Sequence, residues 1–138
     1  MAEITLPFDF IVEGVPATHD SGGREKWKLR VREAARCLVS NEHQPLAMEL
    51  SVAIVYLSES VTSKDVDNII KPILDALIGI VYRDDRIVSQ VLARKTQMRP
   101  DRLISVSSRR LAEALERGLS DFVYIMIRLA PDHSMVPQ

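Results

Sequence analysis

Cysteine occurs once, as Cys37, among the 138 residues of the chain, which excludes an intrachain disulfide. A single thiol suits a reducing compartment, and we expect it to be half-buried on a helix. No stretch of about 18 apolar residues occurs, and the N-terminus lacks the basic start and apolar run of about 7 to 15 residues that mark a signal peptide. We therefore expect a protein that makes no contact with a membrane and is cytoplasmic, or is delivered by means that the sequence does not show.

An excess of charge of one sign is also absent, because 18 Lys and Arg face 19 Asp and Glu for a formal net charge of -1. This excludes a protein coated in positive charge, yet binding of nucleic acid depends on where charge is placed. Six basic residues face two acidic ones in residues 24–36, and six face one in residues 94–110. Candidates for nucleic-acid contacts in these two segments are Arg24, Lys26, Lys28, Arg30, Arg32, Arg94, Lys95 and Arg99.

Hydrophobic residues make up 46% of the chain and charged residues 27%, the balance of an ordinary globular core. We predict a single domain over residues 1–130 and a flexible tail over residues 131–138. Alternation of apolar residues predicts strands at 4–12 and 48–56, and two further strands are predicted at 87–96 and 122–129. Helical spacing predicts helices at 23–41, at 66–81 with an end near Gly79, and at 107–119 with an end at Gly118. Trp27 falls on the apolar face of the first helix, so a place in the core is favoured over stacking on an unpaired base.

This order of elements predicts an α+β or α/β-like fold, in which two to three helices pack on a mixed sheet of about four strands. Pro72 complicates the second helix, because a proline beyond the first turn removes a hydrogen bond and clashes with the preceding turn. The regular helix therefore either begins near Ile69 or is kinked there.

An acidic stretch around this helix contains the candidate catalytic residues. Five aspartates accompany Lys71 within about twenty residues: Asp65, Asp67, Asp75, Asp84 and Asp85. If the helix begins late, Asp65 and Asp67 lie in an extended segment, where residues two apart point the same way and sit about 7 Å apart. Asp67, Lys71 and Asp75 follow at four-residue steps and share a helical face. The two later aspartates follow a turn that could fold them back against the start of the helix.

Clustered carboxylates suit Mg²⁺ or Mn²⁺, which prefer oxygen ligands, and His19, His43 and His133 are isolated from the cluster. Such an ion hydrolyses phosphodiesters by activating water and neutralising developing charge, which Lys71 could also stabilise. A structural interpretation stays open beside it. Asp65 and Asp67 would then favour the helix N-terminus through its dipole, while Lys71 and Asp75 pair on a solvated face.

The run DVDNIIKPILDAL, followed after a short gap by DDRIV, resembles the RusA family of Holliday junction resolvases. In that family a D-x-D-N pair, a lysine and a later aspartate form the active site. The resemblance implies Asp65, Asp67 and Asp85 as metal ligands and Lys71 as the catalytic lysine, with Asn68, Asp75 and Asp84 as candidates for supporting roles. It also implies a magnesium-dependent homodimer that cuts four-way DNA junctions. We favour Asp85 over Asp84 as the ligand, since it lies closer to the third strand.

Three functions remain to be separated. The first is a junction-selective endonuclease acting in DNA recombination and repair, and the second is a less selective branched-DNA or flap nuclease with the same metal chemistry. The third is a non-catalytic DNA-binding protein that keeps the fold. All four catalytic positions are filled, which argues against the third.

Overall fold

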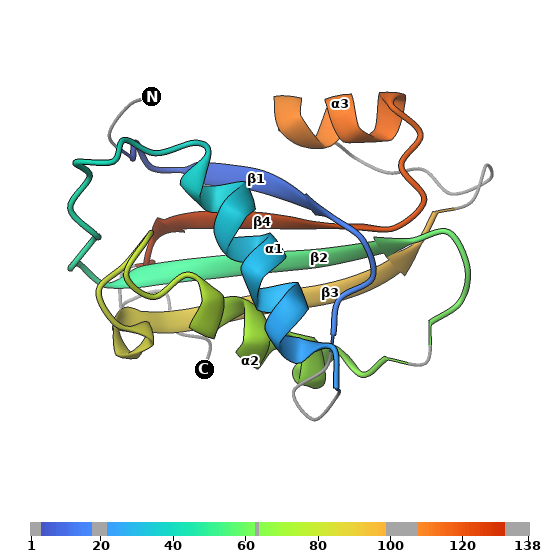
Figure 1. Ribbon diagram of the computed structural model, residues 1–138, viewed down its shortest axis with the longest axis horizontal. Coiled ribbons are helices and arrows are strands. Elements are labelled where there is room, and N and C mark those ends of the chain that lie inside the picture. Colours follow the sequence, from blue (N-terminus) through green and yellow to red (C-terminus); the bar gives the residue numbers. More distant parts are fainter. Residues whose placement is uncertain (1–3, 18–21, 63, 99–107, 132–138) are drawn as a thin grey trace.

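The computed structural model describes residues 4–17, 22–62, 64–98 and 108–131 and has a four-stranded mixed sheet with three α-helices (Figure 1). The elements follow in the order β1 (Phe8–Glu13), α1 (Arg24–Arg36), β2 (Leu50–Ser58), α2 (Val66–Ala76), β3 (Val88–Gln97), α3 (Arg109–Glu116) and β4 (Phe122–Leu129). The strand order in the sheet is β1-β4-β2-β3. The two pairings made by β4 are antiparallel, whereas β2 and β3 are parallel because α2 carries the chain back between them. The predicted fold class and order of elements are confirmed.

Alternation of side chains divides the sheet into two covered faces. One face packs against α1 and α2 and forms the main core, with Phe10 of β1, Ile54 of β2 and Ile125 of β4 at most 1% exposed. The opposite face packs against α3 through a smaller cluster centred on Phe122 and Ala114. Trp27 belongs to the main core and is 4% exposed, as its place on the helix predicts. Figure 1 shows α1 and α2 crossing in front of the sheet, with α3 beside β1.

Helix α2 begins at Val66, so the first of the two alternatives, a start near Ile69, is wrong. Pro72 lies inside the helix and is buried. Its missing N–H removes one helical hydrogen bond, but burial of Ile69 and Ile73 on the same side of the helix stabilises the regular conformation through both turns before it. Asp65 and Asp67 therefore do not share an extended segment, because Asp67 is helical.

Two boundaries differ from the sequence pattern for local reasons. Strand β1 begins at Phe8 rather than at residue 4, since Pro7 directly before it has no N–H for the ladder. Helix α1 ends at Arg36, so Cys37 is its C-cap and is exposed rather than half-buried within the helix. The end of α2 agrees with prediction, and Gly79 has a positive φ of 84° that favours glycine.

A polar network fixes α3 to the first strand. Ser108 is the N-cap of α3 and accepts a hydrogen bond from the Leu111 backbone N–H, while its own hydroxyl donates to the Asp9 carboxylate. The Tyr124 hydroxyl donates to the same carboxylate at 2.8 Å, and Arg110 pairs with it at 3.5 Å. The predicted serine cap of the third helix is confirmed.

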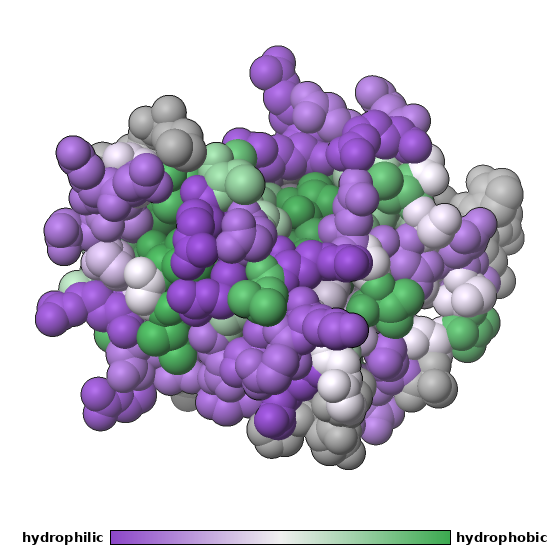
Figure 2. Space-filling model, viewed as in Figure 1, coloured by the Kyte–Doolittle hydropathy of each residue, from purple (hydrophilic) through white to green (hydrophobic). Residues whose placement is uncertain are grey.

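No helix within the described part of the chain is long and apolar enough to cross a membrane. In Figure 2 polar side chains cover most of the face formed by α1 and α2. Hydrophobic residues show through between α1 and α3, where Phe10, Ile11, Ala34 and Leu38 line a shallow groove. Of the predicted tail, only Pro131 lies within the described residues.

Candidate active site

The start of α2 presents two exposed carboxylates. Asp65 is the N-cap and Asp67 lies in the first turn, where the helix dipole favours negative charge. An aspartate at this position ordinarily accepts a hydrogen bond from the first-turn backbone, but the side chain of Asp65 makes no such bond. Neither carboxylate forms a hydrogen bond or ion pair with another residue that the structure describes. Both are therefore available to a ligand, and Asn68 follows in the same turn, half-buried.

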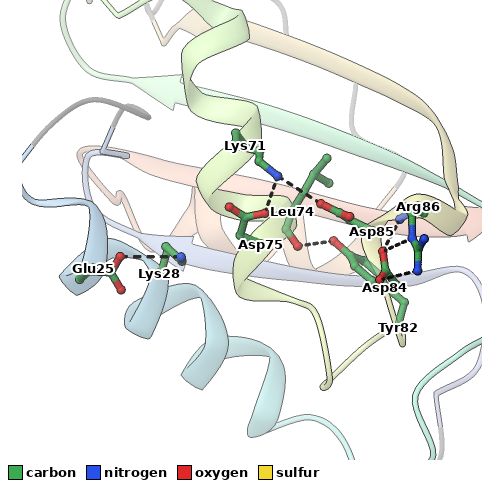
Figure 3. A network of polar contacts seen from close by, with 9 residues as sticks. All are labelled: Glu25, Lys28, Lys71, Leu74, Asp75, Tyr82, Asp84, Asp85 and Arg86. Atoms are coloured by element: carbon green, nitrogen blue, oxygen red, sulfur yellow. Dashed lines mark hydrogen bonds and ion pairs between the residues drawn. The ribbon is translucent and has the colours of Figure 1, made fainter.

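One turn further along α2, Lys71 joins two segments of the acidic stretch (Figure 3). Its ammonium donates to Asp75 at 2.9 Å on the same helix and to Asp85 at 3.4 Å on the loop before β3. The hydrogen bond and charge of Asp75, supported by those of Asp85, raise the pKa of Lys71. The lysine therefore stays protonated. Of the two later aspartates, Asp85 lies against α2, but it contacts the middle of the helix and not its start.

Asp84 and Asp85 have different partners although they are adjacent. Asp84 precedes a short 3-10 helix, η1 (Asp85–Ile87), and its carboxylate accepts a hydrogen bond from the Arg86 backbone N–H at 2.9 Å. This bond, together with the Arg86 side chain, lowers the pKa of Asp84. Figure 3 shows Asp84 paired with Arg86 and Asp85 directed toward Lys71. Asp84 thus stabilises the local turn, whereas Asp85 faces the residues of α2.

Tyr82 fixes the loop that carries Asp85, a role that the sequence pattern does not reveal. Its side chain is fully buried, and its hydroxyl donates to the Leu74 carbonyl of α2 at 2.6 Å. Burial raises the pKa of Tyr82, and the nearby charges of Asp85 and Asp75 raise it further. An aromatic residue between Gly79 and the paired aspartates was the available signal, since an apolar ring in a polar connection is usually anchored in the core.

Arg32 stabilises the far end of the same helix. This residue of α1 donates to the Ala76 carbonyl at 2.9 Å and to the Ile78 carbonyl at 3.3 Å, which are carbonyls that lack helical partners. Because the guanidinium complements the C-terminal dipole of α2, the arginine has a structural role that its position in a basic segment did not indicate. These hydrogen bonds do not test the prediction that Arg32 contacts nucleic acid.

The connection that leads into Asp65 is held by two contacts. Lys95 of β3 donates to the Lys64 carbonyl at 2.8 Å, one residue before Asp65. At the other end of the connection, Asp121 accepts hydrogen bonds from the Tyr56 hydroxyl at 2.6 Å and the Glu59 backbone N–H at 3.0 Å. Neither Tyr56 nor Asp121 stands out in the sequence, because each lies at the end of an apolar strand pattern.

The other basic candidates differ in how far they are engaged. Arg24 and Lys28 both lie within 3.8 Å of Glu25, and Arg30 donates to the Glu13 carbonyl at 3.1 Å. Lys26 and Arg94 are exposed. Arg99 lies outside the described residues, as do His19 and His133.

The donor chemistry of these carboxylates fits a hard divalent cation, since exposed aspartate oxygens are the ligands that Mg²⁺ prefers. The positions of these carboxylates, however, do not form a complete set of metal ligands. Within residues 4–17, 22–62, 64–98 and 108–131, no three His, Cys, Asp or Glu side chains form a group that could hold a metal ion. The structure therefore brings Asp85 to Lys71 and Asp75, but it does not gather Asp65, Asp67 and Asp85 around one point.

Comparison with known families agrees with the motif. Endodeoxyribonuclease RusA matches residues 12–106, which span the chain from β1 through the acidic stretch and β3. Among curated proteins, none matches the chain. The family match covers more than half of the chain and contains Asp65, Asp67, Lys71 and Asp85. The chain belongs to the RusA family of endodeoxyribonucleases.

Proposed function

We propose that this protein is a magnesium-dependent endonuclease that resolves four-way DNA junctions in recombination and repair, with Mn²⁺ as an alternative ion. The observation that carries the proposal is the family match over residues 12–106, which contains every residue of the Lys71 network. Family membership indicates the class of chemistry, and the contact between Lys71 and Asp85 supports the proposal that the reaction takes place there.

Asp65, Asp67 and Asp85 would hold the ion. A bound ion would supply an activated water and would offset the charge that develops on the phosphate. Asp85 is favoured over Asp84 because the Asp84 carboxylate is already engaged by the Arg86 backbone. The three ligands belong to two segments that the structure does not gather around one point, so binding of the ion would have to bring them together.

Lys71 has a distinct role in this proposal. Its ammonium is fully charged and rests between Asp75 and Asp85, and more than half of its side chain is exposed. It can therefore donate to a phosphate oxygen where charge develops during hydrolysis. Asp75 keeps its hydrogen bond to Lys71 and orients the ammonium, which makes Asp75 a positioning residue.

We further propose a homodimer, since resolution of a junction needs two incisions in opposing strands and a twofold axis pairs two identical sites. The test incubates the protein with synthetic four-way junction, flap and duplex DNA, with Mg²⁺, with Mn²⁺ or with chelator, beside the Asp67→Asn variant. Paired symmetric cuts in the junction that need metal and Asp67 are expected, together with a dimer in sedimentation.

Other outcomes distinguish the remaining functions. Equal cleavage of flap and junction DNA would contradict selective junction resolution and would support a less selective nuclease. Junction binding without cleavage under every metal condition would overturn the enzymatic proposal in favour of a DNA-binding protein. A monomer at micromolar concentration would overturn the homodimer.

A further inference from the structure

A second feature lies at the end of the molecule where α1 and α2 both begin (Figure 1). A cleft of about 320 Å³ opens there between the chain after β1, the first turns of α1, and Lys64. Its lining residues are Val15, Pro16, Ala17, Gly23, Lys26, Trp27, Arg30 and Lys64. Three of these residues are cationic and none of the described residues that line it is acidic. We call this feature the basic cleft.

Trp27 lines the basic cleft and also belongs to the main core. Trp27 is 4% exposed, yet its indole N–H has no hydrogen-bond partner among the described residues. A buried donor without an acceptor costs about 1–3 kcal/mol, so such a group usually has a ligand or a water. The N-cap of α1 is Gly23, which has no side chain to bond the first turn of the helix.

The cations of the basic cleft are partly fixed in place. Arg30 donates to the Glu13 carbonyl and lies so close over Gly14 that a Cβ there would come within 2.3 Å of its Nη1 atom. Gly14, with φ of 112°, thus allows the guanidinium to rest beside the cleft. Lys64 is adjacent to Asp65, and its carbonyl is held by Lys95. The cleft is therefore joined directly to the segment that carries the first carboxylate of the active site.

We infer that the basic cleft binds a non-scissile phosphodiester of the DNA strand that enters the active site. Lys26, Arg30 and Lys64 line the cleft and supply the positive charge that favours a phosphodiester. Because carboxylates repel phosphate, a cationic cleft beside Asp65 would hold the strand while a neighbouring phosphate reaches the acidic residues. This inference rests on the proposed action on DNA and adds a subsite to it.

Trp27 is the only tryptophan in the chain, so its fluorescence reports on the cleft directly. The experiment titrates the full chain with a short thymidine oligonucleotide in the absence of divalent metal, and separately with inorganic phosphate. Affinity is followed by anisotropy of a labelled oligonucleotide for wild type, Lys26→Gln, Lys64→Gln and Arg36→Gln. The last variant is the matched control, because Arg36 lies at the opposite end of α1 and pairs with Glu33.

A saturable change in Trp27 fluorescence is expected with the oligonucleotide. Lys26→Gln and Lys64→Gln should each weaken binding about fivefold to tenfold and lower the slope of log affinity against log salt by about 0.7, whereas Arg36→Gln should bind like wild type. Both variants are at the surface, so loss of folding does not obscure the result. A fluorescence change with inorganic phosphate at the same phosphate concentration would add support for a phosphate contact.

Unchanged fluorescence, or unchanged affinity in both lysine variants, would overturn the inference. The proposed function is judged by a different readout, cleavage of junction DNA by wild type. If wild type cuts junctions but both lysine variants bind the oligonucleotide like wild type, only the proposed DNA binding by the basic cleft is rejected. If wild type cuts no substrate but the oligonucleotide still changes Trp27 fluorescence and the lysine variants still bind more weakly, the proposed nuclease activity is rejected. DNA binding by the basic cleft is then retained.

Discussion

The hydroxyl of Tyr82 offers a way to loosen the active site without removing any of its charged groups. Tyr82→Phe keeps the buried ring and removes only the hydrogen bond to the Leu74 carbonyl. A hydrogen bond of this kind contributes about 0.5–1.5 kcal/mol to stability. The Leu74 carbonyl also accepts from the Leu77 backbone at 3.3 Å, so it is not left wholly unpaired. We expect a loss of about 1 kcal/mol, which lowers the urea midpoint by about 0.5 M for a slope of about 2 kcal/mol/M.

The effect on function should exceed the effect on stability. Tyr82 ties the loop of Asp85 to α2, so without the bond Asp85 should lose its fixed distance to Lys71. Metal-dependent cleavage is expected to fall between about tenfold and a hundredfold, because displacement of a catalytic group by about 1 Å carries a cost of this size. Affinity for DNA in the absence of metal should stay unchanged.

Tyr124→Phe is the matched control. Its hydroxyl donates to Asp9 at 2.8 Å on the face of the sheet covered by α3, away from the carboxylates of α2. It should cost a similar amount of stability and leave cleavage unchanged. If the two variants lose equal stability and both cleave like wild type, Tyr82 is only a packing residue and the positioning argument is refuted.

Two further predictions follow from contacts of the same region. Asp85→Asn should abolish metal-dependent cleavage and weaken Mn²⁺ binding, whereas Asp84→Asn should retain most cleavage because Asp84 serves the turn; equal loss in both variants would contradict this assignment. Arg32→Met should lower the free energy of unfolding by about 1–2 kcal/mol through loss of two bonds to the end of α2, while the exposed Arg36→Met should change it by less than about 0.5 kcal/mol. Urea denaturation followed by Trp27 fluorescence measures the stability of the two arginine variants. Equal stability of Arg32→Met and Arg36→Met would contradict the helix-capping role of Arg32.

The acidic site shows where sequence reasoning succeeded and where it stopped. The motif placed Lys71 and Asp85 in one site, and the structure brings them to 3.4 Å. Pro72 favours a helix start near Ile69, yet α2 begins at Val66 because the apolar face around Ile73 is buried. Helix propensity is a local quantity, whereas burial of that face against the sheet is not, and the second decided the outcome.

The sequence by itself determined the elements and their order. The apolar run of β4 predicts its bounds of Phe122–Leu129, and the serine before α3 predicts its cap. These features depend on residues that are close together in the sequence, so the local sequence pattern is enough to predict them.

Only the tertiary structure decided which distant groups meet. Arg32 reaches carbonyls 44 and 46 positions away, and Lys95 holds the carbonyl of Lys64 across 31 positions. The basic cleft likewise joins Trp27 to Lys64. Such contacts depend on how helices pack on the sheet, which is set by the fit of many side chains at once, and no spacing within a single element encodes them.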